Sequence, residues 1–182
     1  MGNRFNSPLK DGFSYYKYNE NVSYEGHWLD HKKHGYGEMK IKNTTFTGEW
    51  KNNNPVNGKL QNENYTYEGD VEWEIGYKHY DILNNKFLYK RTLCKTPEIY
   101  SNTRPDITVY ENSHITPNGN GVLVLTKPSE YDIIKYEGNW VNGVNHGFFI
   151  AYDTKNNKFK QSWNDGVLMF HSQFNDLSFP NL

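Results

Sequence analysis

Aromatic and polar residues alternate in several short stretches of the chain. In the clearest stretch, Tyr24 and Trp28 stand at alternate positions around Gly26, which is the two-residue period of a β-strand. The polar residues 30–34 follow, and a second alternating stretch comes after them. This order of strand, loop and strand predicts a β-hairpin over residues 24–41.

The same arrangement recurs along the chain. Residues 136–147 repeat the pattern of residues 24–35, with an aromatic residue, Gly, Trp, His and Gly at the same relative places. Units that begin with an aromatic residue follow at a period of about 22 residues, which is typical of a repeat array. The sequence therefore predicts about seven hairpins, which begin at Tyr24, Phe46, Tyr67, Tyr89, Tyr110, Tyr136 and Phe159.

The recurring residues of each unit are predicted to be structural. In a strand, the first aromatic residue, the Gly and the Trp share one face, and the Gly leaves a gap that can accept a ring from the neighbouring unit. Burial of one large aromatic side chain contributes roughly 2–3 kcal/mol. The structural repeat positions are Tyr24, Gly26, Trp28, Gly35, Gly37, Phe46, Gly48, Trp50, Tyr67, Gly69, Tyr136, Gly138, Trp140, Gly147 and Trp163.

The rest of the chain divides around this array. Residues 1–11 are polar and are predicted to form an N-terminal arm, and residues 13–18 are predicted to be the first strand. The hairpin array spans residues 12–169 and diverges from the repeat around residues 72–109. Residues 170–182 are predicted to be a C-terminal cap.

The predicted cap has the spacing of a short amphipathic helix. Phe170, Phe174 and Leu177 stand at positions i, i+4 and i+7. Such a segment would cover the open last hairpin, because terminal repeats need a cap, or it would dock on another subunit.

Composition favours a thin structure over a compact globule. Only 35% of the residues are hydrophobic, yet 16% are aromatic, including 15 Tyr and 5 Trp. An aliphatic globular core would need more Leu, Ile and Val. A narrow interior filled by rings agrees better with these values.

The string Tyr-Glu-Gly-x-Trp, followed by a short loop and His-Gly, resembles the MORN (membrane occupation and recognition nexus) repeat. The resemblance is specific in the units that begin at Tyr24, Phe46 and Tyr136, and it fades between about residues 71 and 109. The sixth unit has Phe149 where the last Gly of the repeat would stand. The resemblance implies an all-β fold, an elongated antiparallel solenoid of β-hairpins. Seven hairpins, or about fourteen strands, would be on the order of 65 Å long.

The residues that could carry chemistry have a structural explanation. His27, His31 and His34 are close in sequence, but His34 recurs at His146 without such neighbours, so a repeat position explains it and no metal site is predicted. Glutamates follow the first aromatic residue of several units, and we expect them to be solvated or to brace loops rather than to form a catalytic pair. They are Glu25, Glu68, Glu111 and Glu137.

No catalytic residue and no cofactor are predicted. Cys94 lies outside any nucleophile motif, and the chain has neither a Gly-rich phosphate loop nor a nucleophile elbow. The sequence therefore predicts that the protein is not an enzyme.

The net charge and the targeting signals restrict which partners and which cellular compartment are expected. The net charge of −1 gives no bias toward nucleic acid. The single Cys94 indicates a reducing compartment, and no secretory signal or membrane span is present in the sequence. We expect a cytoplasmic protein associated with the cytoskeleton or another large assembly. Myristoylation of Gly2 is not predicted, because Asn6 stands where the motif requires Ser or Thr.

The leading functional hypothesis is a non-catalytic scaffold that mediates protein–protein interactions within a larger assembly, with self-association as a further contact. The divergent residues 72–109 are the predicted place of a specific contact. One alternative is peripheral binding to an anionic lipid membrane, and another is a regulatory or immunity subunit of an enzyme. The basic residues that would serve membrane binding are Lys32, Lys33, Lys40 and Lys42, followed by Lys86, Lys90, Arg91 and Lys95.

Overall fold

The computed structural model describes residues 11–81, 86–93 and 113–174. These residues form twelve β-strands and no helix. The strands are β1 (Gly12–Lys17), β2 (Val22–Leu29), β3 (Lys32–Ile41), β4 (Thr44–Lys51), β5 (Asn54–Gln61), β6 (Tyr65–Asp81), β7 (Lys86–Leu93), β8 (Ser113–Leu125), β9 (Ile133–Val141), β10 (Val144–Asp153), β11 (Lys158–Asn164) and β12 (Val167–Gln173).

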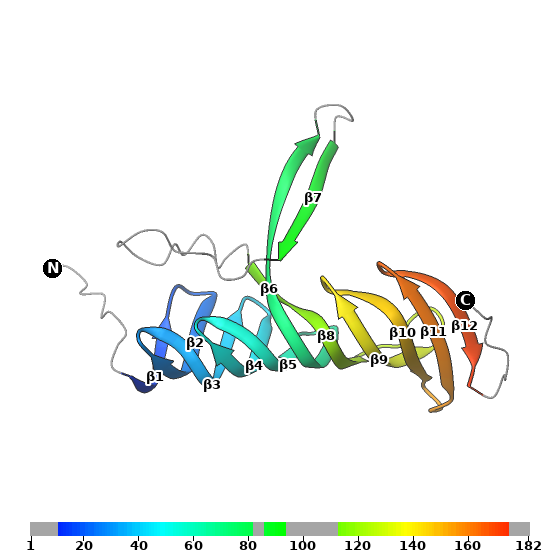
Figure 1. Cartoon of the computed structure of the whole chain (residues 1–182), viewed down its shortest axis with the longest axis horizontal. Helices are drawn as coiled ribbons and strands as arrows, with labels where there is room; N and C mark the ends of the chain where they lie inside the picture. Colours follow the sequence, from blue (N-terminus) through cyan, green and yellow to red (C-terminus); the bar gives the residue numbers. More distant parts are fainter. Residues whose placement is uncertain (1–10, 82–85, 94–112, 175–182) are drawn as a thin grey trace.

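The strands build one open antiparallel sheet, which confirms the predicted elongated hairpin array (Figure 1). Strands β1 to β6 follow one another, β8 lies beside β6, and β8 to β12 continue the path, whereas β7 pairs only with β6. Strand β1 corresponds to the strand predicted over residues 13–18. At about 4.8 Å per strand, the eleven strands of the path extend for about 50 Å.

The predicted C-terminal helix is not formed by the residues that the structure describes. Phe170 lies in β12 and Phe174 in the turn that follows it. Strand β12 pairs with β11 along its length, and these backbone hydrogen bonds hold Phe170 in an extended conformation. Leu177 lies outside the described residues.

The hairpin turns are shorter than the predicted loops. Only Asp30 and His31 join β2 to β3, with φ angles of 49° and 60°, so His34 already belongs to β3. Positive φ at both central residues is the turn geometry that matches the twist of a hairpin. Two-residue turns with positive φ also stand at Asn52 and Asn53, Asn142 and Gly143, and Asp165 and Gly166.

The middle of the chain departs from the seven-unit prediction. The unit that begins at Tyr67 has its return strand in β8, where Gly121 pairs with Gly69. Tyr89 does not begin a unit, because it lies in β7 opposite Lys78 of β6. Tyr110 lies outside the described residues. The path therefore holds five hairpins after β1, and the residues between β6 and β8 are an insertion into the third hairpin.

The insertion begins with a two-stranded ribbon. Strand β6 continues to Asp81, and β7 pairs with this extension from Glu74 opposite Leu93 to Asp81 opposite Lys86. In Figure 1 the ribbon stands away from the sheet. The ribbon thus places part of the divergent segment at a distance from the repeat array.

A row of glycines crosses the sheet from β2 to β9. Each of these strands contributes one glycine that lies directly opposite the glycine of the next strand. The register therefore continues unchanged across the insertion. The row consists of Gly26, Gly37, Gly48, Gly58, Gly69, Gly121 and Gly138. We call this row the glycine ladder. The inner face of the sheet is the face toward which a side chain at the ladder positions would point.

Each pair of ladder glycines lies beneath one aromatic ring of its own hairpin. The ring of Tyr24 covers Gly26 and Gly37, and a Cβ added to Gly37 would lie 2.6 Å from Cζ of Tyr24. Phe46 and Tyr67 cover the next two pairs in the same way. The gap predicted at the glycine is thus filled by the first aromatic residue of the same unit rather than by a ring of the neighbouring unit.

The tryptophans link each hairpin to the one before it. The ring of Trp50 meets the ring of Tyr24 edge to face at 5.3 Å, and its indole N–H donates to the carbonyl oxygen of Gly37 at 3.2 Å. Trp140 makes the same contact with Tyr67 at 5.1 Å, across the insertion. Most of the buried hydrophobic side chains form one cluster along the inner face. Burial also raises the pKa values of Tyr24 and Tyr67 well above their ordinary value.

The glycine ladder ends at β10. Phe149 stands there opposite Gly138, and its own ring covers that glycine. The next strand has Gln161, which is 2% exposed, in the ladder position. The Gln161 amide accepts a hydrogen bond from the Trp163 indole at 3.0 Å and lies 2.9 Å from Nδ1 of His171. Hydrogen bonding thus replaces ring-on-glycine packing in the last hairpin.

Substitution of Trp140 by alanine should lower the free energy of unfolding by about 3–5 kcal/mol, because it removes a buried ring that joins two hairpins. Chemical denaturation followed by circular dichroism measures the change. Tyr36→Ala is the matched control, since Tyr36 is 60% exposed and its loss should cost less than about 1 kcal/mol. Equal effects of the two substitutions would contradict this role of Trp140.

Gly37→Ala should cost about 1–3 kcal/mol, because the added methyl group overlaps the Tyr24 ring. In a Tyr24→Leu background the same substitution should cost less, because the ring that it displaces is gone. A double-mutant cycle from denaturation curves measures the coupling. Independent, additive effects would show that the ring does not require the glycine.

Candidate functional site

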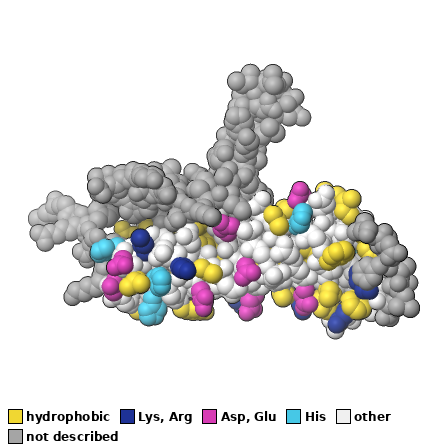
Figure 2. All heavy atoms as spheres, viewed as in Figure 1, with side chains coloured by type: hydrophobic (Ala, Val, Ile, Leu, Met, Phe, Trp, Pro, Cys, Tyr) yellow, Lys and Arg dark blue, Asp and Glu magenta, His cyan; other side chains and the backbone are white. Residues whose placement is uncertain are grey.

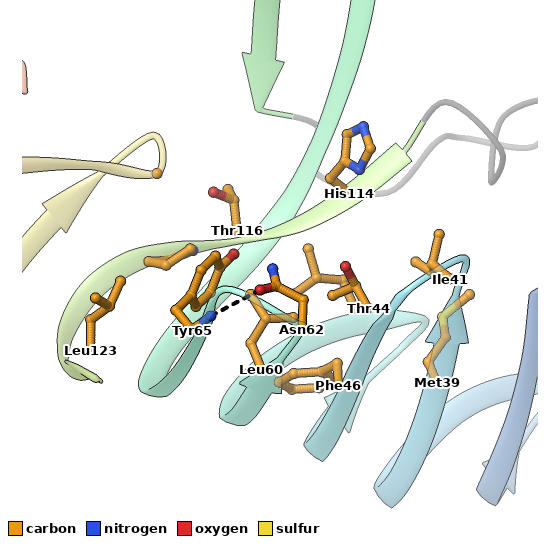
Figure 3. A pocket seen from close by; sticks show the side chains of 13 residues that line it. Met39, Ile41, Thr44, Phe46, Leu60, Asn62, Tyr65, His114, Thr116 and Leu123 are labelled. Atoms are coloured by element: carbon orange, nitrogen blue, oxygen red, sulfur yellow. Dashed lines mark hydrogen bonds between the residues drawn. The ribbon is translucent and has the colours of Figure 1, made fainter. Parts of the chain in front are cut away.

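A hollow of about 500 Å³ lies on the inner face, between the first half of β8 and the hairpins that precede it (Figure 3). The fully buried side chains of Met39, Phe46 and Leu60, from β3, β4 and β5, line one side. Ile115 and the two residues after it in β8 line the other. The hollow therefore exists only because β8 returns from the insertion along this path.

Polar as well as apolar side chains line this hollow. Thr44, Asn62, His114 and Thr116 line it together with the apolar side chains. The Asn62 side chain already accepts a hydrogen bond from the backbone N–H of Tyr65 at 3.0 Å, the dashed line in Figure 3. The described lining combines apolar side chains with hydroxyl, amide and imidazole groups and includes no Asp, Glu, Lys or Arg.

The hollow could not be located from the repeat pattern. The sequence motif marks the glycines and rings of each unit, and its period assigned the residues of β8 before Pro117 to a unit that begins at Tyr110. In the structure they belong to the return strand of the third hairpin. The usable signal was the pair Gly119 and Gly121, which matches the spacing of Gly35 and Gly37 and marks β8 as a return strand.

Lys33 occupies the interior instead of the surface. The side chain is fully buried, and its ammonium group lies 5.4 Å from the ring centroids of Tyr18 and Trp50, 5.6 Å from that of Tyr24 and 6.0 Å from that of Trp28. Nζ also donates a hydrogen bond to the Tyr18 hydroxyl at 3.2 Å. Aromatic faces attract a desolvated cation, so the four rings compensate for the lost hydration.

The other basic residues proposed for membrane contact do not form a cluster with Lys33. Lys32 and Lys42 are exposed, and Lys40 pairs with Glu38 at 3.2 Å. The side chains of Lys86, Lys90 and Arg91 are not among those described, and Lys95 lies outside the described residues. The prediction that Lys33 contributes to a basic surface is wrong, because its charge is enclosed by rings.

The histidines do not form a metal site in the described part of the chain. His27 and His31 are exposed, whereas His34 lies in β3. No group of three His, Cys, Asp or Glu residues gathers there as metal ligands. His146, the counterpart of His34, instead contacts Asp165, with 3.1 Å between Nδ1 and Oδ1.

The glutamates at positions 25, 68 and 137 lie on the face opposite the glycine ladder, which we call the outer face. Glu25 and Glu68 are exposed there. Glu137 forms an ion pair with Lys135 and accepts a hydrogen bond from the Tyr152 hydroxyl at 2.9 Å. The hydrogen bond from Lys135 is the main reason that the pKa of Glu137 lies below its ordinary value. Glu111, like Cys94 and Gly2, lies outside the described residues.

Three segments of the chain match the model of the MORN repeat family: residues 24–44, 46–60 and 136–148. They correspond to the hairpins β2–β3 and β4–β5 and to most of β9–β10. The chain therefore carries MORN repeats, as the resemblance of the sequence predicted. Comparison with curated proteins gives no match. No helix among the described residues is long and apolar enough to cross a bilayer.

Acylation of native protein should separate Lys33 from its sequence neighbour Lys32. We expect Lys33 to react at least about tenfold more slowly, because its amine is reached only when the hairpin opens. Mass spectrometry of peptides after brief treatment with an amine-reactive ester measures both rates, and urea should remove the difference. Equal rates in native protein would contradict the enclosed position.

Proposed function

We propose that this chain of MORN repeats is a non-catalytic cytoplasmic scaffold that mediates protein–protein interactions within a larger assembly. The observation that carries the proposal is the β6–β7 ribbon, which interrupts the repeat and projects from the sheet (Figure 1). The sheet supplies a body of fixed shape, and the ribbon supplies a surface that the repeats themselves lack.

The sheet is suited to hold partners at fixed distances. Rings contact each other from one hairpin to the next, from Tyr24 with Trp50 to Tyr136 with Trp163. Because every hairpin packs against its neighbours, the array resists bending between its ends. A body of this kind supports separate contacts along its length.

The ribbon has the features of a strand that pairs with a partner. Beyond Ile75, which is the last β6 residue paired with β8, the described strands β6 and β7 pair only with each other. Each strand therefore has one edge whose N–H and C=O groups can bond to an added strand. A two-stranded ribbon is only marginally stable alone in water, which favours a partner that completes it.

Membrane binding is the weaker alternative. It needs a cluster of basic side chains at the surface. In the first predicted cluster, Lys33 is buried and Lys40 is paired with Glu38. A regulatory subunit of an enzyme would use the same surfaces as a scaffold. The identity of the protein that the ribbon binds would distinguish the two.

Removal of the ribbon should abolish specific binding without unfolding the array. Because Ile75 lies opposite Thr92, a two-residue Asn-Gly turn can replace residues 76–91. Quantitative mass spectrometry of proteins that co-purify from the native source should show the loss of the main partner, while circular dichroism and Tm remain close to those of the intact chain. The control replaces the turn residues Asp30 and His31 by Asn-Gly. An unchanged set of partners would contradict the proposal.

A further inference from the structure

The polarity of the outer face changes between β6 and β8. Along one row of directly opposed residues, the strands before the insertion carry charged or hydroxyl side chains, whereas β8 and β10 carry branched apolar ones. The row runs through Glu25, Glu38, Thr47, Lys59, Glu68, Val122, Glu137, Ile150 and Lys160. After the insertion, apolar and charged side chains thus alternate along a row that carries only charged or hydroxyl side chains in the strands before it.

This apolar surface is hollowed into a groove of about 750 Å³. Val122, Phe148, Ile150 and Phe174 line it, and Glu137 and Lys160 add charged groups. The Phe148 side chain is 65% exposed. Figure 2 shows further exposed hydrophobic side chains toward the C-terminal end of the sheet. An apolar groove of this size on a surface indicates a place where another chain segment binds.

We propose that the groove binds the chain's own residues 175–182. The last described residue, Phe174, already lines the groove, so the eight residues that follow it in the sequence begin beside the groove. Two contacts hold Phe174 there: its N–H donates to the carbonyl oxygen of Lys158 at 3.0 Å, and the ammonium group of Lys160 lies 4.9 Å from its ring centroid.

The length of the segment matches the groove. Eight extended residues span up to about 26–29 Å, whereas the three strand spacings from β11 to β8 add up to about 14 Å. The segment can therefore cross Ile150 and reach Val122. It also has the required composition, because Leu177, Phe179 and Leu182 can enter an apolar groove.

The charge of residues 175–182 supports the same placement in the groove. Asp176 is the only charged residue of the segment and follows Phe174, which contacts Lys158 and Lys160, by two residues in the sequence. In the proposed placement its carboxylate would be near these two lysines. The segment then covers the outer face of β8 to β11 rather than the open edge of β12. This inference does not depend on the proposed scaffold function.

Disulfide trapping in the full chain tests the placement. In a Cys94→Ser background, cysteines replace Ile150 and Leu177. Mild oxidation should give a monomer in which the two cysteines are joined, identified by mass spectrometry of the linked peptides. The control pairs Leu177→Cys with Thr47→Cys, because Thr47 lies in the same outer row on β4, beyond the reach of a residue three positions after Phe174.

Two results would overturn the proposal. A disulfide-linked dimer would show that the groove binds the segment of a second copy, and the absence of any link would show that the segment does not reach the groove. A bond that formed equally well to residue 47 would also exclude a defined position.

A second measurement leaves the sheet itself unchanged. Leu177→Ser combined with Phe179→Ser should increase the fluorescence of the apolar dye anilinonaphthalene sulfonate severalfold, because the groove becomes open to it. The matched variant Asn175→Ser with Asn181→Ser should leave dye binding at the level of the intact chain. Unchanged fluorescence in the first variant would contradict occupation of the groove by Leu177 and Phe179.

Discussion

The structure depends on the close approach of an aromatic ring to two glycines that face each other on neighbouring strands. Tyr24 can cover Gly26 and Gly37 only while these residues lie directly opposite, because a shift by one residue would place a side chain under the ring. A shift of one residue also turns every side chain of a strand to the other face. The ring-on-glycine contact therefore fixes the register of each hairpin as well as its packing.

The tryptophans extend this local constraint to the whole array. Trp50 contacts the ring of the preceding hairpin and hydrogen-bonds to one of the glycine carbonyls beneath it, so adjacent units share one network. At the C-terminal end, the buried Gln161 uses its amide to hold Trp163 and His171. Polar groups of a buried amide need partners, and both are present. The last hairpin thus keeps the register by hydrogen bonding where the glycine is missing.

Much of the fold could be predicted, because identical residues recur at fixed spacing in the units that begin at Tyr24 and Tyr136. The prediction failed between Tyr67 and Gly121, since Tyr89 fits the period by coincidence while its strand pairs with an extension of β6. Local patterns indicate strands but not which strand lies beside them. The inner hollow and the burial of Lys33 were missed for the same reason, because both depend on contacts between different hairpins.

The pairing of Gly69 with Gly121 shows that the array keeps its geometry although a long insertion separates these two residues. The insertion enters and leaves through adjacent strands, so its ends lie where a short turn would otherwise connect them. A hairpin of this array can thus act as a host into which new modules are inserted at the tip. Recombination or protein engineering could exchange such modules and give the same backbone different binding properties.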